Sequence, residues 1–325
     1  MLFGKIKVKK DVFIMTIKEL LFMWLDNYEK ERVKPRTYSR YQSIIELHLI
    51  PEFGDISIEN LKRRAIQEFL TKKKKEGNLL SGKELSSAST NLMLTVLSMA
   101  FEYAIDMEIC EDNPCIRLKR IPEDSKKVEA FTRDEQKKIE AYIKSSNDRR
   151  LFGILLDFYS GIRIGELIAL EWQDVDFDKG LIYINKTAYR DKSKTGEWEV
   201  CIDKPKTKSS ERVIPLPTCI IELMKEYSIT SKSDYVIENK KSERMSIRSY
   251  QYIFEKITEK VGVRKLNFHA IRHTFATRAI ECGMDIKTLS EIMGHKNASI
   301  TLNRYSHSML DTKIAMMNKL QFIFN

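Results

Sequence analysis

The chain has 325 residues, enough for two domains that each bury a core of their own. Lysine and arginine number 56 against 46 acidic residues, so the net charge of +10 favours a polyanionic partner. No apolar run approaches the roughly eighteen residues of a membrane span, and the basic start lacks a signal-peptide core. These features predict a cytoplasmic protein without a membrane partner.

Apolar residues at helical spacing predict an all-helical first domain over residues 16–112, after a basic leader of residues 1–15. The capping-box pattern of Thr16 and Glu19 opens the first helix. We expect helices over four ranges: 16–28, 37–49, 58–70 and 87–107. Pro51 with Gly54 is expected to end the second helix, and residues 71–83 to form a lysine-rich turn.

Basic side chains on this first domain are candidates for DNA contacts. A solvated face explains a charged run more often than a DNA contact does, so each residue alone is weak evidence. The candidates are Arg36, Arg40, Arg63, Arg64, Lys72 and Lys73. A polar, proline-containing segment over residues 113–130 is expected to be the linker to a second domain.

The second domain is expected over residues 131–325, and it opens with another capping box, formed by Thr132 and Glu135. Helices over about 132–143, 151–159 and 165–170 lead into short strands separated by turn residues, near 180–185, 197–202 and 212–216. Helices then resume and continue to a C-terminal tail helix. The fold class is therefore mainly α with a small antiparallel β-sheet.

Residues suited to phosphate chemistry gather in this second domain. His269 and Arg272 are three positions apart, so on one helix they project from one face. His295 follows a helix stop at Gly294, and Tyr305 lies ten residues later. A lone histidine is more often structural than functional, and the one tyrosine is among thirteen. The four residues together are stronger evidence for a phosphate site than any one of them alone.

Two earlier segments add candidates, and each has a simpler explanation when taken alone. Gly161-Ile-Arg163-Ile-Gly-Glu166 places an arginine at a helix junction with an acidic residue three positions on, which is also typical of a surface pair. Lys206 and Lys208 lie in a turn before the 212–216 strand, where a solvated turn is the commoner explanation. No histidine or cysteine spacing supplies a zinc-like ligand set, so no metal site is predicted.

Taken in order, these motifs resemble those of the tyrosine recombinase, or phage integrase, family. The matching runs are Gly-Ile-Arg-x-Gly-Glu-Leu, His-x-x-Arg-His-Thr-Phe-Ala-Thr, Met-Gly-His and Tyr-x-His, at Arg163, His269, Arg272, His295 and Tyr305. The helical part ahead resembles the family's SAM-like core-binding domain, so the resemblance extends from about Thr16 to the end of the chain.

The resemblance implies DNA cleavage and rejoining without a metal or ATP cofactor. Tyr305 would attack the scissile phosphate, leaving a 3′-phosphotyrosyl bond and a free 5′-hydroxyl. Arg163, Arg272 and His295 would stabilise the charge on the phosphate. Lys206, or else Lys208, would protonate the 5′-oxygen, His269 would assist, and Glu166 would orient the cluster. His273 and His307 are expected to be structural.

The family also suggests partners. These are double-stranded DNA with an inverted-repeat core site, a homo-tetramer assembled on it through the C-terminal segment, and an accessory directionality factor. Only about fifteen residues precede Thr16, which argues against an arm-binding domain. We expect an integrase of a phage or conjugative transposon. A Xer-type chromosome-dimer resolvase, a catalytically silent DNA-binding protein of the same fold and a type IB topoisomerase are alternatives.

Overall fold

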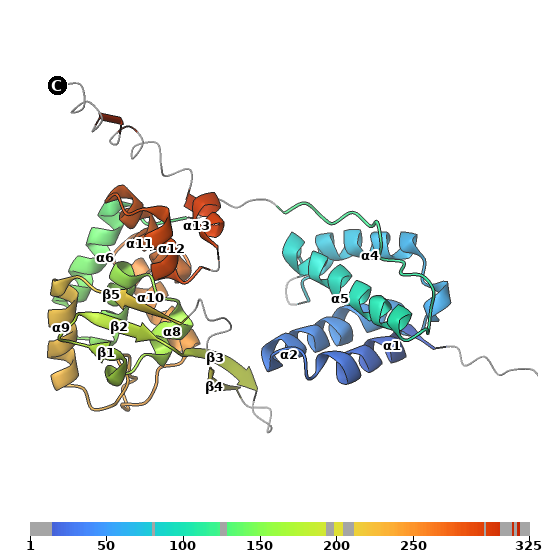
Figure 1. Ribbon diagram of the computed structural model, residues 1–325, viewed down its shortest axis with the longest axis horizontal. Coiled ribbons are helices and arrows are strands. Elements are labelled where there is room, and N and C mark those ends of the chain that lie inside the picture. The colour runs from blue at the N-terminus through green and yellow to red at the C-terminus, as the bar shows by residue number, and fades with distance from the viewer. Residues whose placement is uncertain are drawn as a thin grey trace, which may run out of the picture. The chain divides into compact units, whose positions relative to one another are not determined.

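The computed structural model describes residues 15–79, 82–123, 129–192, 198–203, 211–295, 297–305, 314, 317 and 318. The chain divides into two compact units, Met1–Ser125 and Lys126–Asn325, which Figure 1 draws in blue to cyan and in green to red. Helices predominate among the described residues, and the strands form two small antiparallel sheets, which confirms the expected fold class. No helix of this described part is long and apolar enough to cross a membrane.

The first unit is built from helices. Its capping box is present as predicted, with Glu19 bonded to the backbone of Thr16 at 2.8 Å. Turns of π-helix continue the first two α-helices. The elements in order are α1 (Ile17–Trp24), a π-helix (Leu25–Glu29), α2 (Pro35–Ile44), a π-helix (Ile45–Leu49), α3 (Ile50–Phe53), a 3₁₀ turn (Ile58–Asn60), α4 (Arg63–Glu76) and α5 (Ser87–Asp106).

Two expectations in this unit need correction. Gly54 caps the helical path that follows α2, as expected, but Pro51 does not contribute to its end, because it lies in the first turn of α3, where its missing N–H leaves no gap, and the path continues to Phe53. The lysine-rich stretch is not a turn, because α4 continues to Glu76. Lysine is a good helix former, and its charge stabilises the negative end of the helix dipole.

The core of the first unit consists of the apolar stripes of these helices. Trp24 and Phe69, on α1 and α4, are almost completely buried, and the rings of Phe69 and Phe53 lie 4.9 Å apart. The chain after α5 returns along it, because the Asn91 side chain exchanges two 2.9 Å hydrogen bonds with the backbone of Ile121. The described start of the segment expected to be a linker is therefore held against α5.

The second unit combines helices with two small sheets. Its helices are α6 (Arg133–Ser145), α7 (Phe152–Ser160), α8 (Ile164–Ala169), α9 (Thr218–Ile229), α10 (Ile247–Lys260), α11 (His269–Glu281), α12 (Ile286–Met293) and α13 (Ala298–Tyr305), with 3₁₀ turns at Arg149–Leu151 and Trp172–Asp174. Its strands are β1 (Val175–Asp176), β2 (Leu181–Ile184), β3 (Thr187–Lys192), β4 (Trp198–Asp203) and β5 (Arg212–Pro215). The Thr132 capping box is also present as predicted.

The strands pair differently from the single sheet that we expected. β2 lies between β1 and β5, whereas β4 pairs with β3 as a separate hairpin. The β3 residues Thr187–Lys192 are mostly polar, so they lack the apolar signal of a core strand, and the hairpin was not predicted. Both sheets matter for the site, because β5 contacts α12 and β3 contacts α8.

Candidate active site

The C-terminal end of α12 is the centre of the site. Leu289 and Met293 are completely buried on this short helix, which fixes it against α11. The helix ends at Gly294, whose left-handed backbone (φ 61°) favours glycine. The last carbonyl groups of a helix have no partner within the helix, and they carry the negative end of its dipole. They therefore offer acceptors to cations.

Three arginines from distant parts of the chain donate to three successive carbonyls here. Arg212, at the start of β5, donates from Nε to the Ile292 carbonyl at 2.6 Å. Arg272, on α11, donates from Nη2 to the Met293 carbonyl. Arg163, just before α8, donates from Nη2 to the Gly294 carbonyl at 2.9 Å. The end of α12 thus gathers three guanidinium groups.

Close packing at this point requires two glycines. A Cβ on Gly294 would lie 3.0 Å from the Arg212 side chain. Gly161, which ends α7 with φ 59°, would place a Cβ 2.3 Å from the ring of Phe275 on α11. Its carbonyl accepts a second hydrogen bond from Arg272, so the α7–α8 turn and α11 are joined through that arginine.

Arg272 is the most buried of the three, with 1% of its surface exposed. Burial, and then the nearby charge of Arg163, lower its pKa to about 9. The group therefore keeps its positive charge at neutral pH. A buried, charged guanidinium held by backbone carbonyls is costly to place, which is typical of a functional site.

Glu166 is the acidic partner of this cluster and is 4% exposed. Its carboxylate accepts four hydrogen bonds: from the backbone N and Nη1 of Arg163, at 3.0 and 2.8 Å, and from Nη1 and Nη2 of Arg212, at 3.2 and 2.8 Å. Burial alone would raise its pKa, but the Arg212 hydrogen bonds and the charges of both arginines hold it at about 2. Three arginines against one carboxylate leave the site positive.

His295 follows Gly294 directly and contacts both Arg272 and α13. An arginine nitrogen can only donate, so the 3.1 Å contact from Arg272 Nη2 makes His295 Nε2 the acceptor. His295 Nδ1 then carries the proton and donates to Thr301 Oγ1 at 2.7 Å. Thr301 is completely buried, so its hydrogen bond to His295 holds α13 against the site.

The remaining catalytic candidates are only partly described. His269 is exposed at the start of α11, and its ring lies edge-on, 4.5 Å from that of His273. Tyr305 is the last residue of α13, the helix that Thr301 joins to His295, but its side chain lies outside the described part. Lys206, Lys208 and His307 also lie outside the described residues.

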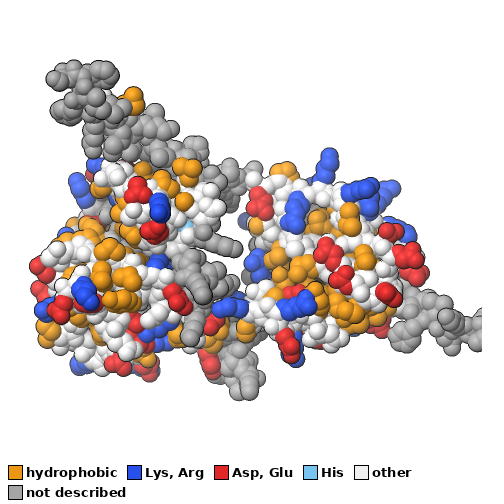
Figure 2. Space-filling model, in the orientation of Figure 1, with side chains coloured by type: hydrophobic (Ala, Val, Ile, Leu, Met, Phe, Trp, Pro, Cys, Tyr) orange, Lys and Arg blue, Asp and Glu red, His pale blue; other side chains and the backbone are white. Residues whose placement is uncertain are grey.

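The candidate DNA-binding residues lie on two helices of the first unit. Arg36 and Arg40 are exposed on α2, one helical turn apart. The other four lie on α4, where Lys and Arg side chains gather in Figure 2: Arg63, Arg64, Lys72 and Lys73. Some of these charges have acidic neighbours, such as Glu68, 2.8 Å from Arg64.

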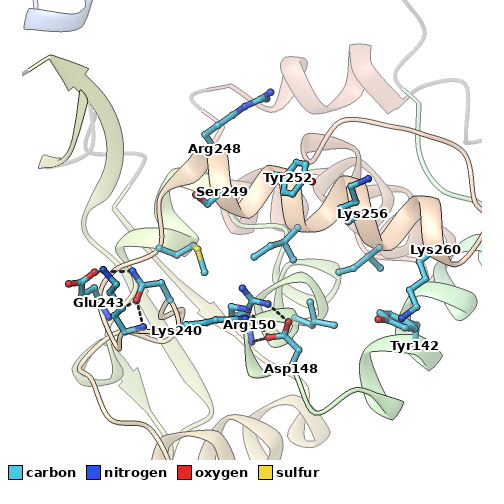
Figure 3. A pocket seen from close by; sticks show the side chains of 16 residues that line it. Tyr142, Asp148, Arg150, Lys240, Glu243, Arg248, Ser249, Tyr252, Lys256 and Lys260 are labelled. Carbon is cyan, nitrogen blue, oxygen red and sulfur yellow. Dashed lines mark hydrogen bonds and ion pairs between the residues drawn. The ribbon is translucent and has the colours of Figure 1, made fainter. Parts of the chain in front are cut away.

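Two features of the second unit escaped the sequence analysis. One is Arg212, which carries no motif signal beyond its place at the start of a strand. The other is a cavity of about 860 Å³ between α10, α6 and residues 239–245, where basic side chains outnumber acidic ones (Figure 3). Its cations are Arg150, Lys240, Lys241, Arg248, Lys256 and Lys260.

Comparison with known families matches most of the chain. The model of the phage integrase family matches residues 129–311, and that of the phage integrase N-terminal SAM-like domain matches residues 16–74. A tyrosine recombinase XerC-like protein of Caldanaerobacter subterraneus is 29% identical, covering 95% of this chain and 84% of its own length. The ICEBs1 integrase of Bacillus subtilis is 27% identical, covering 88% and 78%.

Solved structures of two integrases are also similar. The Tn1549 transposon integrase in complex with transposon right end DNA superposes with a TM-score of 0.79 at 24% identity, covering 94% of this chain and all of that one. A lambda integrase tetramer bound to a Holliday junction gives a TM-score of 0.66 at 20% identity, covering 91% and 84%.

Proposed function

Because the chain belongs to the phage integrase family, we propose that it is a site-specific recombinase that cleaves and rejoins DNA through a covalent tyrosine intermediate. The observation that carries this proposal is the set of three guanidinium groups on successive carbonyls of α12, next to His295. The cluster is positive and preorganised, as stabilisation of a phosphodiester transition state requires.

Within this proposal, each described residue has a defined part. Arg163, whose side chain is 36% exposed, and Arg272 would clamp the non-bridging oxygens of the scissile phosphate. His295 would add a hydrogen bond once Nε2 carries a proton. Glu166 would hold Arg163 in orientation through the bonds described above. Because these groups are already fixed, little reorganisation is needed when the transition state forms.

The nucleophile would be Tyr305. A tyrosine with a pKa of about 10 needs positive neighbours to lose its proton at neutral pH. Its oxygen would attack phosphorus as the bond to the 5′-oxygen breaks, giving a 3′-phosphotyrosyl link. Lys206 would protonate the leaving 5′-oxygen, with Lys208 as the alternative, and His269 would assist proton transfer. The phosphotyrosyl bond keeps the energy needed for rejoining, so no cofactor enters the scheme.

We further propose that the substrate is an inverted-repeat core site of a mobile element. Support comes from similarity to the ICEBs1 integrase and to the transposase of transposon Tn916, which is 25% identical over 90% of this chain. The XerC-like relative makes a chromosome-dimer resolvase the second candidate. A homo-tetramer on DNA, an accessory directionality factor and a cytoplasmic location complete the proposal.

DNA contacts are proposed on both units. In the first unit they would come from the basic residues of α2 and α4, and in the second from the basic cavity beside α10. Phosphate contacts of this kind make binding fall steeply as salt rises. They set affinity and register, whereas the catalytic cluster performs the chemistry.

Adduct formation tests the proposal. DNA flanking the gene would be incubated in EDTA with wild-type protein, with Tyr305→Phe and with a control, Tyr183→Phe, at a partly exposed tyrosine of β2. We expect a protease-sensitive protein–DNA adduct from wild type and control, and none from Tyr305→Phe. Equal adduct from Tyr305→Phe would refute the nucleophile assignment. Tight binding without any adduct would favour the silent DNA-binding alternative.

A further inference from the structure

We propose that Arg212 is a positioning residue for the recombination reaction: it holds Glu166, and through it Arg163, in the geometry that receives the scissile phosphate. This inference rests on the proposed function. It assigns to Arg212 a role distinct from those of Arg163 and Arg272, which would touch the phosphate themselves.

The contacts of Arg212 support an indirect role. Its side chain is 6% exposed, against 36% for Arg163. Arg272 is also buried, but it donates to backbone carbonyls and to His295, whereas Arg212 is bound to a carboxylate. Both terminal nitrogens donate to Glu166, and Nε donates to the Ile292 carbonyl. This planar, bidentate arrangement is specific to arginine, because a lysine ammonium cannot form it.

The contacts of Glu166 show how the effect would reach Arg163. Arg212 supplies two of the four hydrogen bonds on the Glu166 carboxylate, and Arg163 supplies the other two. Without Arg212, the carboxylate would stay buried but lose half of its donors and one of its two cations. Its pKa would then rise from about 2 towards the range of ordinary assay conditions. Once protonated, Glu166 would hold Arg163 less firmly.

Arg212 also ties separate parts of the site together. It begins β5, whose backbone is fixed by pairing with β2 from Ile184 to Leu181, and it bonds to the end of α12 just before His295. The close approach of Gly294 to its guanidinium leaves little room for an alternative side-chain position. A displacement of about 1 Å in a catalytic group can cost on the order of a hundredfold in rate.

The test measures single-turnover adduct formation at saturating DNA between pH 5 and 9 for wild type, Arg212→Met and Arg212→Lys. For Arg212→Met we expect a rate loss on the order of a hundredfold at neutral pH. The acid limb of the pH–rate profile should also move upward by about one pH unit or more. Arg212→Lys should fall between wild type and Arg212→Met, because it restores the charge without the fork.

Two controls separate positioning from general structural damage. Arg244→Met removes another partly buried arginine, one that bonds to Glu171 at 2.9 Å, and it should leave the shape of the pH profile unchanged. Adding Glu166→Gln to Arg212→Met removes the titrating carboxyl, so the upward shift of the acid limb should disappear.

The outcomes are distinguishable from failure of the proposed function, which would appear as no adduct from wild type. If wild type reacts and Arg212→Met reacts at the same rate with the same profile, the inference is overturned. A rate loss with no change in the pH profile, matching Arg244→Met, would also overturn it. If Arg212→Met does not fold, Arg212→Lys carries the same comparison.

Discussion

The cores of the two units differ in how much charge they bury. The first unit buries the apolar stripes of its helices, together with a few polar side chains: Asn91, whose amide is paired with backbone, is one, and Glu29 is the one charged side chain among its described buried residues. The second unit also has a large apolar core, but it buries three ionisable side chains that are close enough to interact: Arg272, Glu166 and Asp157. Burying apolar surface stabilises a fold, whereas burying charge costs free energy. The cost of burying these charges supports the proposal that this helix end is the site of the reaction.

The largest effect on the reaction is expected from removing the most buried charge of the second unit. Arg272→Met should reduce the rate of adduct formation by about 10²–10³-fold, the usual loss for one group that stabilises the transition-state charge. It also leaves the Gly161 and Met293 carbonyls without this donor. The measurement is single-turnover cleavage at saturating DNA.

A matched control lies on the same helix. Arg278 is partly buried on α11 and donates to the Phe131 carbonyl at 2.8 Å and to Glu281 at 2.6 Å, outside the arginine cluster. Arg278→Met should lower stability but leave the cleavage rate of the folded protein nearly unchanged. Equal rate losses from the two variants would show that the burial of charge does not mark the site.

In the first unit, the corresponding change should affect stability and not chemistry. Phe69→Ala removes a ring that is 2% exposed, so it should lower the free energy of unfolding of that unit by about 3–5 kcal/mol. Leu47, which is 52% exposed, provides the control: Leu47→Ala should change stability by less than about 0.5 kcal/mol. Calorimetry of the full chain measures both. Similar effects from the two variants would contradict the assigned core.

The same difference explains what the sequence could predict. Apolar spacing and the capping boxes of Thr16 and Thr132 located most helices, because each signal lies within one short segment. Motif resemblance then indicated Arg163 and Arg272, which the structure brings to one helix end. Their catalytic roles, and those of Lys206 and Tyr305, remain proposals.

The sequence could not predict that three arginines meet at the end of α12. Arg212 meets Glu166 across 46 residues and Ile292 across 80, so no local periodicity reports the contact. The β3–β4 hairpin was missed for a related reason: β3 is mostly polar and gives no strand signal, and β4, which was expected as a strand, pairs with β3 and not with the central sheet. The extension of α4 was missed because a lysine run was interpreted as a turn when its helix propensity and the helix dipole favour continuation.

The last predicted effect is a dependence of stability on pH, and it concerns Asp157 on α7, a buried carboxyl to which no described arginine donates a hydrogen bond. Among the described residues neither of its oxygens has a hydrogen-bond partner, and burial raises its pKa well above the ordinary value near 3.8, despite the charge of Arg272. The folded protein therefore keeps Asp157 neutral where the unfolded chain ionises it. The stability that this group contributes is fully present below about pH 4 and is lost as pH rises towards the folded pKa.

Asp157→Asn keeps the shape of the side chain but cannot ionise, so its stability relative to wild type should increase with pH. The slope should approach about 1.4 kcal/mol per pH unit over the range in which the folded protein retains the proton. Denaturant unfolding at pH 5 and pH 8 measures this difference, with Asp178→Asn, at an exposed position of the same unit, as the control. A difference that does not depend on pH would mean that Asp157 is ionised in the folded protein. A second negative charge would then offset part of the positive charge of the arginine cluster, whereas a neutral Asp157 leaves that charge available for the phosphate.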